Sequence, residues 1–308
     1  LMSIRDLHTY FYMDQGTLRA VRGVSLDIMP AETLGIVGES GCGKSIMALS
    51  VLNMIFLPGK IVKGQIFFRQ NEHTIDIASL NANSKDIRNI RGRDIAIIFQ
   101  EPMTSLSPVH TVGNQISEVI VLHQEKNKTQ AREHALKMMD RVGIPLPVER
   151  FKQYPHEISG GMRQRIMIAM ALSCNPKLLI ADEPTTALDV TIQSQILRLI
   201  KNIQRDYRMA VMLITHDLGV IAENADKVAV MYLGAVMEYT DVLSIFDEPL
   251  HPYTKLLMKS MPSINNPHKA RLDVIEGSVP SPFMKIGGCP FHPRCLQAVN
   301  GICNMADP

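Results

Sequence analysis

The first hundred residues alternate short apolar runs with turn residues. The clearest runs are residues 24–28, 33–37 and 65–69, which are rich in β-branched or aromatic side chains. Runs of this length and composition predict β-strands. A glycine-dense loop lies between the second and third runs. We therefore expect a β-rich amino-terminal region built around that loop.

The pattern changes to a helical period over residues 111–143. Apolar side chains recur there at spacings of three and four, which places them on one face of a helix. These positions are Ala131, Ala135, Met138, Met139 and Val142. The simplest interpretation is a helical insertion.

Strand patterns return after Pro176, at residues 177–181, 210–215 and 227–231, with a helical pattern at 191–205. A strand, a helix and a second strand in succession predict neighbouring parallel strands. Beyond Asp247 the composition changes, because half of the 18 prolines lie in this last fifth of the chain. Proline fixes φ and lacks a backbone donor, so we expect no long helix or strand there.

The composition is that of a folded globular protein, with 46% hydrophobic and 20% charged residues. A formal net charge of +2 argues against a nucleic-acid partner bound through broad electrostatic attraction. The longest apolar stretches, 166–172 and 228–237, are shorter than the roughly 20 residues that cross a bilayer. Arg5 and Asp6 stand where a signal peptide needs an apolar core. We expect a reducing, cytosolic environment, in which cysteines are thiols or metal ligands.

A phosphate-binding motif follows the run at 33–37. Residues 38–45, Gly-Glu-Ser-Gly-Cys-Gly-Lys-Ser, fit GxxxxGK[ST] and lead from a predicted strand into a helix beginning near Lys44. Glycines let backbone N–H groups approach phosphate oxygens, and a helix N-terminus favours their charge. Lys44 would contact the β- and γ-phosphates of ATP or GTP, and Ser45 would bind Mg²⁺. The expected nucleotide-binding residues are Gly38, Ser40, Gly41, Cys42, Gly43, Lys44 and Ser45.

A second acidic element supports nucleotide hydrolysis. The apolar run at 178–181 ends in Asp182 and Glu183. Asp182 would hold Mg²⁺ through water, and Glu183 would polarise the attacking water as general base. Such a pair usually only ends a strand, but its place after a phosphate loop in the same chain favours the catalytic interpretation.

Four further motifs make the chain resemble the ATP-binding cassette (ABC) ATPases. Residues 158–165, Ile-Ser-Gly-Gly-Met-Arg-Gln-Arg, resemble the family's signature loop, although Ile158 and Met162 depart from its commonest form. Gln100 resembles the Q-loop, residues 187–189 the D-loop, and His216 the switch histidine. The resemblance covers residues 3–240.

This resemblance implies an α/β fold: an ABC-type P-loop ATPase with a RecA-like core, an antiparallel β subdomain and a helical subdomain. It implies that the nucleotide-binding core with the β subdomain takes residues 1–100 and 174–246. The helical signature subdomain takes residues 101–173, and a cysteine-containing carboxyl-terminal extension takes residues 247–308.

The resemblance also implies roles for individual residues. In this family two ATPase subunits pack head to tail, and each signature loop closes over the partner's ATP. The implied ATP contacts are Ser159, Gly160, Gly161 and Asp189, beside Asp182 and the phosphate loop. The implied catalytic residues are Glu183, His216 and Gln100, with Gln100 also near Mg²⁺.

An adenine-stacking aromatic is also implied on the first strand. We predict that Phe11 stacks on the adenine, with Tyr12 as the second candidate. Because Glu183 and His216 are both present, we infer that this subunit's own nucleotide site is hydrolytic.

The resemblance narrows to one subfamily at three places, which are Met162 and the segments 99–108 and 167–172. They resemble the first of two unlike ATPase subunits in dipeptide and oligopeptide ABC importers, a subfamily that nickel importers share. His-Pro-Tyr-Thr at 251–254 and Pro-Ser-Pro at 280–282 resemble its extension. The implied partners are a second ATPase subunit, two permease subunits and an extracytoplasmic binding protein. The implied location is the cytoplasmic face of the plasma membrane.

Three of the five cysteines, Cys289, Cys295 and Cys303, lie close to the carboxyl end. They resemble the subfamily's iron–sulfur motif, which uses four cysteines for a [4Fe-4S] cluster. Thiolates also suit zinc, but the spacings lack close CxxC pairs. Unliganded thiols are the third alternative. Neither Cys42, inside the phosphate loop, nor Cys174, after an apolar helix, is a convincing fourth ligand.

Two hypotheses from other functional classes are alternatives to a transporter ATPase. An ABC-type ATPase acting on DNA or ribosomes would need long coiled coils or a second cassette, and neither is present in this chain. An iron–sulfur electron carrier would leave the nucleotide motifs unexplained. Among importers, we expect peptide cargo ahead of nickel or glutathione-type cargo.

Overall fold

The computed structural model describes residues 1–100, 105–186, 188–260, 275 and 277–307. These residues form two compact units. The first unit comprises Leu1, Ile28–Thr33 and Leu80–Ile214, and the second comprises Met2–Asp27, Leu34–Ser79 and Thr215–Pro308. The boundaries expected near residues 100, 173 and 246 follow the family resemblance and stay a prediction.

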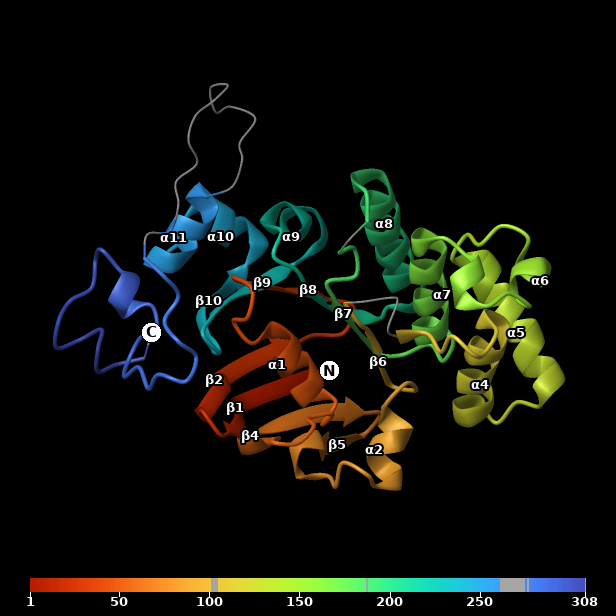
Figure 1. Ribbon diagram of the computed structural model, residues 1–308, viewed down its shortest axis with the longest axis horizontal. Coiled ribbons are helices and arrows are strands. Elements are labelled where there is room, and N and C mark those ends of the chain that lie inside the picture. The colour runs from red at the N-terminus through yellow and green to blue at the C-terminus, as the bar shows by residue number, and fades with distance from the viewer. Residues whose placement is uncertain (101–104, 187, 261–274, 276, 308) are drawn as a thin grey trace. The chain divides into compact units, whose positions relative to one another are not determined.

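Three parallel strands form the centre of the first unit (Figure 1). They are β6 (Ile95–Ile98), β7 (Leu178–Asp182) and β8 (Ala210–Ile214), and β7 pairs with both of the others. Every residue of β7 and β8 is buried, as in strands covered on both faces. Helix α8 (Val190–Tyr207) connects β7 to β8. The predicted parallel pairing is therefore confirmed.

The helical pattern at 111–143 forms two helices. Helix α4 (Val112–Gln124) ends at Glu125, which has a φ of 52°. Helix α5 (Lys128–Arg141) begins at Asn127, which forms a reciprocal capping box with Gln130. A left-handed residue followed by a new N-cap stops one helix and starts the next, so the predicted helical insertion consists of two helices.

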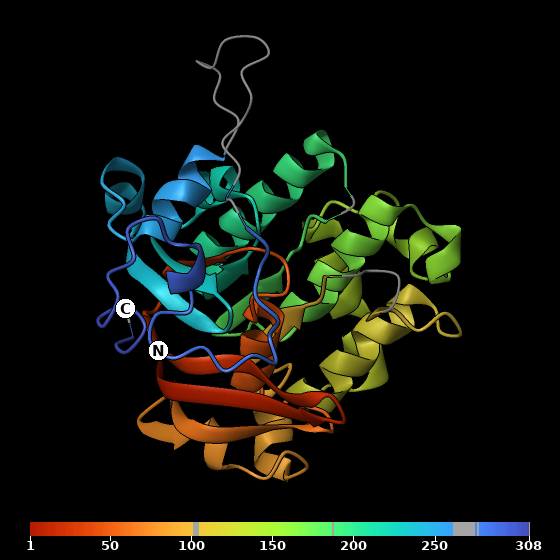
Figure 2. The same ribbon diagram turned by 60° about the vertical axis from the view of Figure 1, so that its left-hand side comes forward.

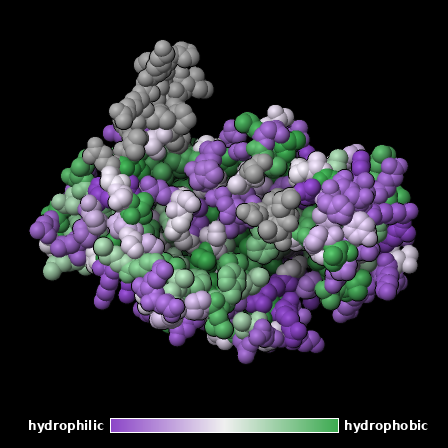
Figure 3. Space-filling view, viewed as in Figure 1, coloured by the Kyte–Doolittle hydropathy of each residue, from purple (hydrophilic) through white to green (hydrophobic). Residues whose placement is uncertain are grey.

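Among its described residues, the first unit contains further helical elements. They are α2 (Lys85–Ile90), α6 (Pro147–Arg150), the 3₁₀ turn η2 (Pro155–Glu157) and α7 (Gly160–Leu172). Helix α7 contacts α4, α5 and β6, and six of its 13 residues are buried, five of them between Ile166 and Leu172. Hydrophilic side chains cover much of the outer surface of α5 in Figure 3. Burial of α7 explains why its sequence is apolar nearly all round.

An antiparallel sheet dominates the second unit. Its strands are β1 (Met2–Met13), β2 (Gly16–Ile28), β4 (Gly59–Gln70) and β5 (His73–Asp76), in the order β2-β1-β4-β5. The predicted runs at 24–28 and 65–69 are only the apolar ends of β2 and β4. Polar residues such as Arg19 and Arg22 continue β2 on its half-buried face, which an apolar-run criterion overlooks.

The second unit also contains β3 (Thr33–Val37), which pairs in parallel with β9 (Lys227–Tyr232). Strand β10 (Ala235–Asp241) runs antiparallel to β9. Helix α1 (Lys44–Val51) follows β3, and a hydrogen bond of 2.8 Å joins the hydroxyls of Ser50 on α1 and Thr9 on β1. The second unit also contains the 3₁₀ turn η1 (Ile77–Ser79) and helix α9 (Leu218–Asn224).

The extension contains only short elements: α10 (Val242–Asp247), α11 (Pro252–Lys259) and η3 (His292–Arg294). In the described part of the extension, no element is longer than the 8 residues of α11, as its prolines predict. Its chain follows the β1–β2 edge (Figure 2), where Arg22 Nη2 donates to the carbonyl oxygen of Ile286 at 3.0 Å. Across the described ranges, no helix has both the length and the apolar character to cross a membrane.

Candidate functional site

The phosphate loop lies between β3 and α1, as the sequence predicts. Gly38 and Gly43 have φ values of +154° and +104°. A side chain at Gly38 would collide with the carbonyl oxygen of Met231, and one at Gly43 would collide with that of Ala20. Both positions therefore require glycine, and the loop can approach β2 and β9 closely.

Lys44 is folded into this loop. Its Nζ donates to the carbonyl oxygens of Gly38 at 2.9 Å and Glu39 at 3.1 Å, and the residue is 5% exposed. Cys42 is also buried, and burial raises the pKa of its thiol. Ser45 is half-buried at the start of α1, whereas Ser40 and Gly41 are exposed. The buried ammonium group of Lys44 and the exposed residues Ser40 and Gly41 thus belong to the same short segment of the loop.

His216 belongs to the second unit, together with the phosphate loop. The preceding residue, Thr215, donates its backbone N–H to the carbonyl oxygen of Ile36 on β3 at 3.1 Å. The following residue, Asp217, caps helix α9 by accepting from Gly219 N at 2.8 Å. These two bonds fix the backbone on both sides of His216, whose side chain is exposed.

Gln100 and Glu183 meet in the first unit, where β6 and β7 end. Gln100 Nε2 donates to Glu183 Oε2 at 2.8 Å, and the Thr186 hydroxyl donates to the same oxygen at 2.8 Å. Asp182, the last residue of β7, is 5% exposed. The carboxyl ends of parallel strands share one edge, so the sheet brings these side chains together. Sequence reasoning missed Thr186, which no motif marked.

The signature loop begins helix α7. Ser159 is the N-cap, and its hydroxyl accepts from Met162 N at 3.4 Å. Gly160 is exposed, and a Cβ at this position would meet no heavy atom within 4 Å. Gln164, 1% exposed, donates to the carbonyl oxygen of Pro184 at 2.5 Å. The signature helix is thereby tied to the segment that carries Glu183.

The D-loop starts the next helix. Asp189 caps α8 by accepting from Ile192 N at 2.9 Å, and its side chain is exposed. Gly161 lies near Ile192, because a Cβ there would be 3.4 Å from that side chain. Ala187, the first D-loop residue, and residues 101–104, which follow Gln100, lie outside the described residues.

Phe11 lies opposite Gly59 in the β1–β4 pair. A Cβ at Gly59 would be 2.5 Å from the Phe11 ring, so the ring packs over this glycine. Tyr12 is 48% exposed, and the ammonium group of Lys60 lies 5.1 Å from its ring centroid. The assignment of Phe11 to adenine stacking stays a prediction.

The three carboxyl-terminal cysteines do not form a metal site in the part of the chain that the structure describes. That part holds no group of three or more His, Cys, Asp or Glu placed to bind a metal ion. Cys289 Sγ lies 3.6 Å from His251 Nε2, and Cys303 Sγ accepts from Val299 N at 3.4 Å. Burial, and then the charges of Cys295 and Cys303, raise the pKa of Cys289. The expected iron–sulfur cluster is therefore not supported.

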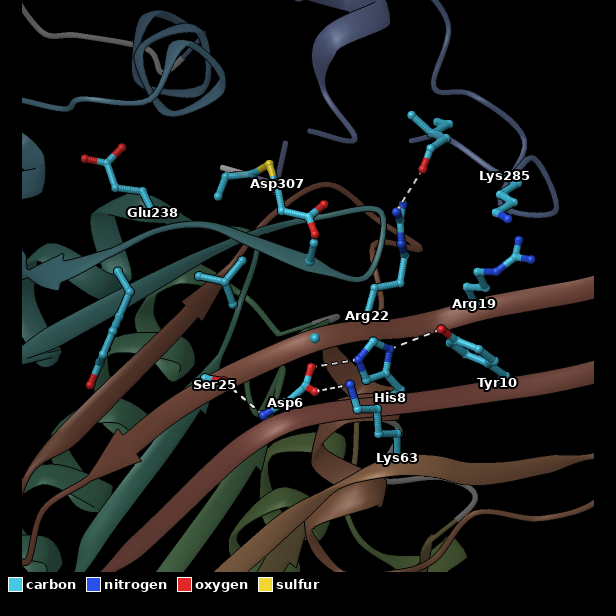
Figure 4. A pocket seen from close by; sticks show the side chains of 16 residues that line it. Asp6, His8, Tyr10, Arg19, Arg22, Ser25, Lys63, Glu238, Lys285 and Asp307 are labelled. Atoms are coloured by element: carbon cyan, nitrogen blue, oxygen red, sulfur yellow. Dashed lines mark hydrogen bonds and ion pairs between the residues drawn. The ribbon is translucent and has the colours of Figure 1, made fainter. Parts of the chain in front are cut away.

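A cavity of about 700 Å³ lies in the second unit, between the β1–β2 edge, β10 and the extension (Figure 4). The Arg19 guanidinium lies 5.9 Å from the Tyr10 ring centroid, and Lys63 pairs with Asp6 at 2.6 Å. Both signs of charge line this cavity, from Arg19, Arg22, Lys63, Lys285, Asp6, Glu238 and Asp307. None of its lining residues belongs to a nucleotide motif. The cavity is a feature separate from the phosphate loop.

Three features together define an ABC-type ATPase. They are the phosphate loop between a strand and a helix, the Gln100–Glu183 pair, and the signature helix capped by a serine. Residues 21–186 match the ABC transporter family, and the chain belongs to it. The solved post-hydrolysis dimer of the ATP-binding cassette MJ0796, bound to ADP and phosphate, has the same fold. It aligns with a TM-score of 0.69 at 24% identity over 79% of this chain and 99% of that one.

A second match is more specific. Residues 237–303 match the family described as the oligopeptide/dipeptide transporter C-terminal region. The dipeptide transport ATP-binding protein DppD of Bacillus subtilis is 51% identical over 100% of this chain and 90% of its own. The probable peptide ABC transporter ATP-binding protein y4tR of Sinorhizobium fredii is 50% identical over the same shares. The chain is an ABC transporter ATP-binding protein of the group that carries this carboxyl-terminal region.

Proposed function

We propose that this chain is the ATP-hydrolysing subunit that powers the import of di- and oligopeptides through an ABC transporter. The observation that carries the proposal is one chain with both a complete set of nucleotide motifs and the region matched at 237–303. The peptide cargo named for the relatives supports the same conclusion. Nickel or glutathione-type cargo is the alternative within the family.

The residues of the chain fit ATP with Mg²⁺. The Ser45 hydroxyl, the Asp182 carboxylate and the Gln100 amide are hard oxygen donors, which Mg²⁺ prefers. When bound, the metal neutralises charge on the triphosphate. Lys44 would exchange its carbonyl partners for phosphate oxygens. Glu183, oriented by Gln100 and Thr186, would accept a proton from the attacking water.

A second ATPase subunit would complete the site. Ser159 and the N–H groups at the start of α7 would bind a partner's ATP in this proposal. ATP then stabilises the closed pair, and the loss of γ-phosphate contacts at Ser159 and His216 after hydrolysis reopens it. An unlike second ATPase, and therefore a heterodimer, is the arrangement we propose.

The motion would be passed to two membrane permease subunits at the cytoplasmic face of the plasma membrane. Gln100 stands at the entry to the helical region and contacts Glu183. In our proposal, Gln100 links occupancy of the Mg²⁺ site to a groove that receives a permease helix. An extracytoplasmic binding protein would deliver the peptide and set its identity, because this chain would not contact the cargo.

Purification from detergent-solubilised membranes tests the proposal. We expect two permease subunits and a second ATPase to copurify. The reconstituted assembly should take up di- and oligopeptides in an ATP-dependent manner. Uptake of Ni²⁺ in place of peptides would favour the alternative cargo. An assembly that neither binds nor hydrolyses ATP when given cargo would refute the proposal.

The [4Fe-4S] cluster is a separate hypothesis, and no step above depends on it. The carboxyl-terminal group offers three thiols, whereas such a cluster takes four ligands. Iron and sulfide analysis of protein purified without oxygen decides the question. About four irons per chain would establish the cluster, one zinc would indicate the alternative metal, and neither would mean unliganded thiols.

A further inference from the structure

The extension contacts the phosphate loop directly, within the second unit. Arg294 Nη1 lies 3.2 Å from Glu39 Oε2, and the Glu39 backbone N–H donates to the Tyr253 hydroxyl at 3.2 Å. Glu39 is the second residue of the phosphate loop. Its carbonyl oxygen accepts from Lys44 Nζ at 3.1 Å. Thus the side chain, N–H and carbonyl of one loop residue each have a defined partner, and two of these partners belong to the extension.

The contact is built into a packed core rather than lying on the surface. The Arg294 side chain is 6% exposed. It also donates to the Tyr232 hydroxyl at 3.2 Å and to the carbonyl oxygen of Ile275 at 3.0 Å. The rings of Tyr232, Tyr253 and Phe291 pack on one another with centroids 4.8 to 5.3 Å apart. This core fixes the guanidinium and the Tyr253 hydroxyl before any nucleotide arrives.

The charge of Glu39 needs such a partner. A carboxylate on a loop that binds a triphosphate repels the ligand, and the repulsion is strong where water is excluded. Burial, and then the nearby Glu39 carboxylate, raise the pKa of the Tyr253 hydroxyl. A guanidinium remains charged throughout the physiological range and can neutralise the carboxylate.

We propose that Arg294 is a positioning residue for ATP binding, which holds Glu39 and neutralises its charge so that the phosphate loop accepts a triphosphate. The carboxyl-terminal extension thereby becomes part of the nucleotide site. Tyr253 assists by holding the Glu39 N–H. This inference rests on the proposed ATP binding and adds a role for the extension that the nucleotide motifs do not contain.

Equilibrium binding of a fluorescent ATP analogue with Mg²⁺ to the full chain tests this proposal. We expect Arg294→Gln to weaken binding about fivefold to tenfold, because it leaves Glu39 charged and uncompensated. Arg294→Lys should recover part of the loss. Lys285→Gln, which removes an exposed cation of the same extension, is the matched control and should bind like the wild type.

A second substitution separates positioning from general destabilisation. Glu39→Gln alone should change affinity less than about twofold, because the neutral amide can still accept from Arg294. Added to Arg294→Gln, it should restore most of the affinity, since no uncompensated charge remains. If the double variant binds as weakly as Arg294→Gln or more weakly, the charge argument is overturned.

Two controls keep the outcome clear. If Arg294→Gln does not fold, Tyr253→Phe removes only the hydroxyl that accepts from Glu39 N and should weaken binding about two- to fivefold. Wild-type affinity in Tyr253→Phe would then refute the proposed contact. If the wild-type chain itself binds no ATP, the proposed function fails. If it binds and all variants match it, only this inference fails.

Discussion

Two glycines of the phosphate loop allow a sharp test of how the loop is built. Gly43 has a φ of +104°, and a Cβ there would collide with the backbone oxygen of Ala20. Gly41 has a φ of +76°, with no heavy atom within 4 Å of a Cβ. Alanine at Gly41 therefore introduces only left-handed strain, about 1–2 kcal/mol. Alanine at Gly43 adds an overlap with backbone that cannot move aside, about 1–3 kcal/mol more.

We expect Gly43→Ala to lower the free energy of unfolding by about 2–5 kcal/mol and Gly41→Ala by about 1–2 kcal/mol. Urea denaturation measures both, and the slope with denaturant should be unchanged, because the surface exposed on unfolding is the same. Both variants should bind ATP more weakly. Equal destabilisation by the two substitutions would refute the argument that close approach to β2 requires Gly43.

Other substitutions test the catalytic and electrostatic assignments. Glu183→Gln should keep ATP binding and slow hydrolysis by the assembled transporter about 10²- to 10⁴-fold, and undiminished turnover would remove Glu183 as the base. Ser159→Asp should preserve the N-cap of α7 and the midpoint of unfolding, because aspartate also caps helices. It should lower hydrolysis by the assembled transporter about a hundredfold, because the added carboxylate would repel a phosphate of the partner's ATP. Retained hydrolysis would contradict the contact between Ser159 and the partner's ATP. Burial lowers the pKa of His134, whose Nε2 lies 2.9 Å from the Ser173 carbonyl oxygen. Near pH 6.5 only the unfolded chain binds a proton at this position, so the free energy of unfolding should fall as the pH drops below 6.5. The fall should be smaller in His134→Gln than in the wild type. In His73→Gln, which changes an exposed histidine as a control, it should equal that of the wild type.

The nucleotide motifs were predictable because each is a short run in which local geometry determines function. Strand, glycine loop and helix follow one another at 33–51, and the helix does begin at Lys44. The signature loop at 158–165 is likewise one short run, and helix α7 begins within it at Gly160. Here neighbours in sequence are neighbours in space, so no knowledge of the fold is needed.

Some features could not be predicted from the sequence, because the decisive signal was weak or distant. The break at Glu125 depends on one left-handed residue inside a favourable helical pattern. The long strands β2 and β4 carry polar residues on their half-buried faces and do not stand out as apolar runs. Three cysteines suggested a cluster, but a metal site requires side chains to converge, and spacing alone does not establish convergence.

The amino-acid sequence alone determined the chemistry of this protein: a loop for phosphates, carboxylates after a buried strand and the order of motifs that marks an ABC ATPase. Only the tertiary structure decided which of these groups have partners. Gln100 and Glu183 lie 83 residues apart, and Arg294 lies 255 residues from Glu39, yet each pair is in hydrogen-bond contact. Such contacts depend on strand order and core packing, which bring distant segments together and leave no local pattern in the chain.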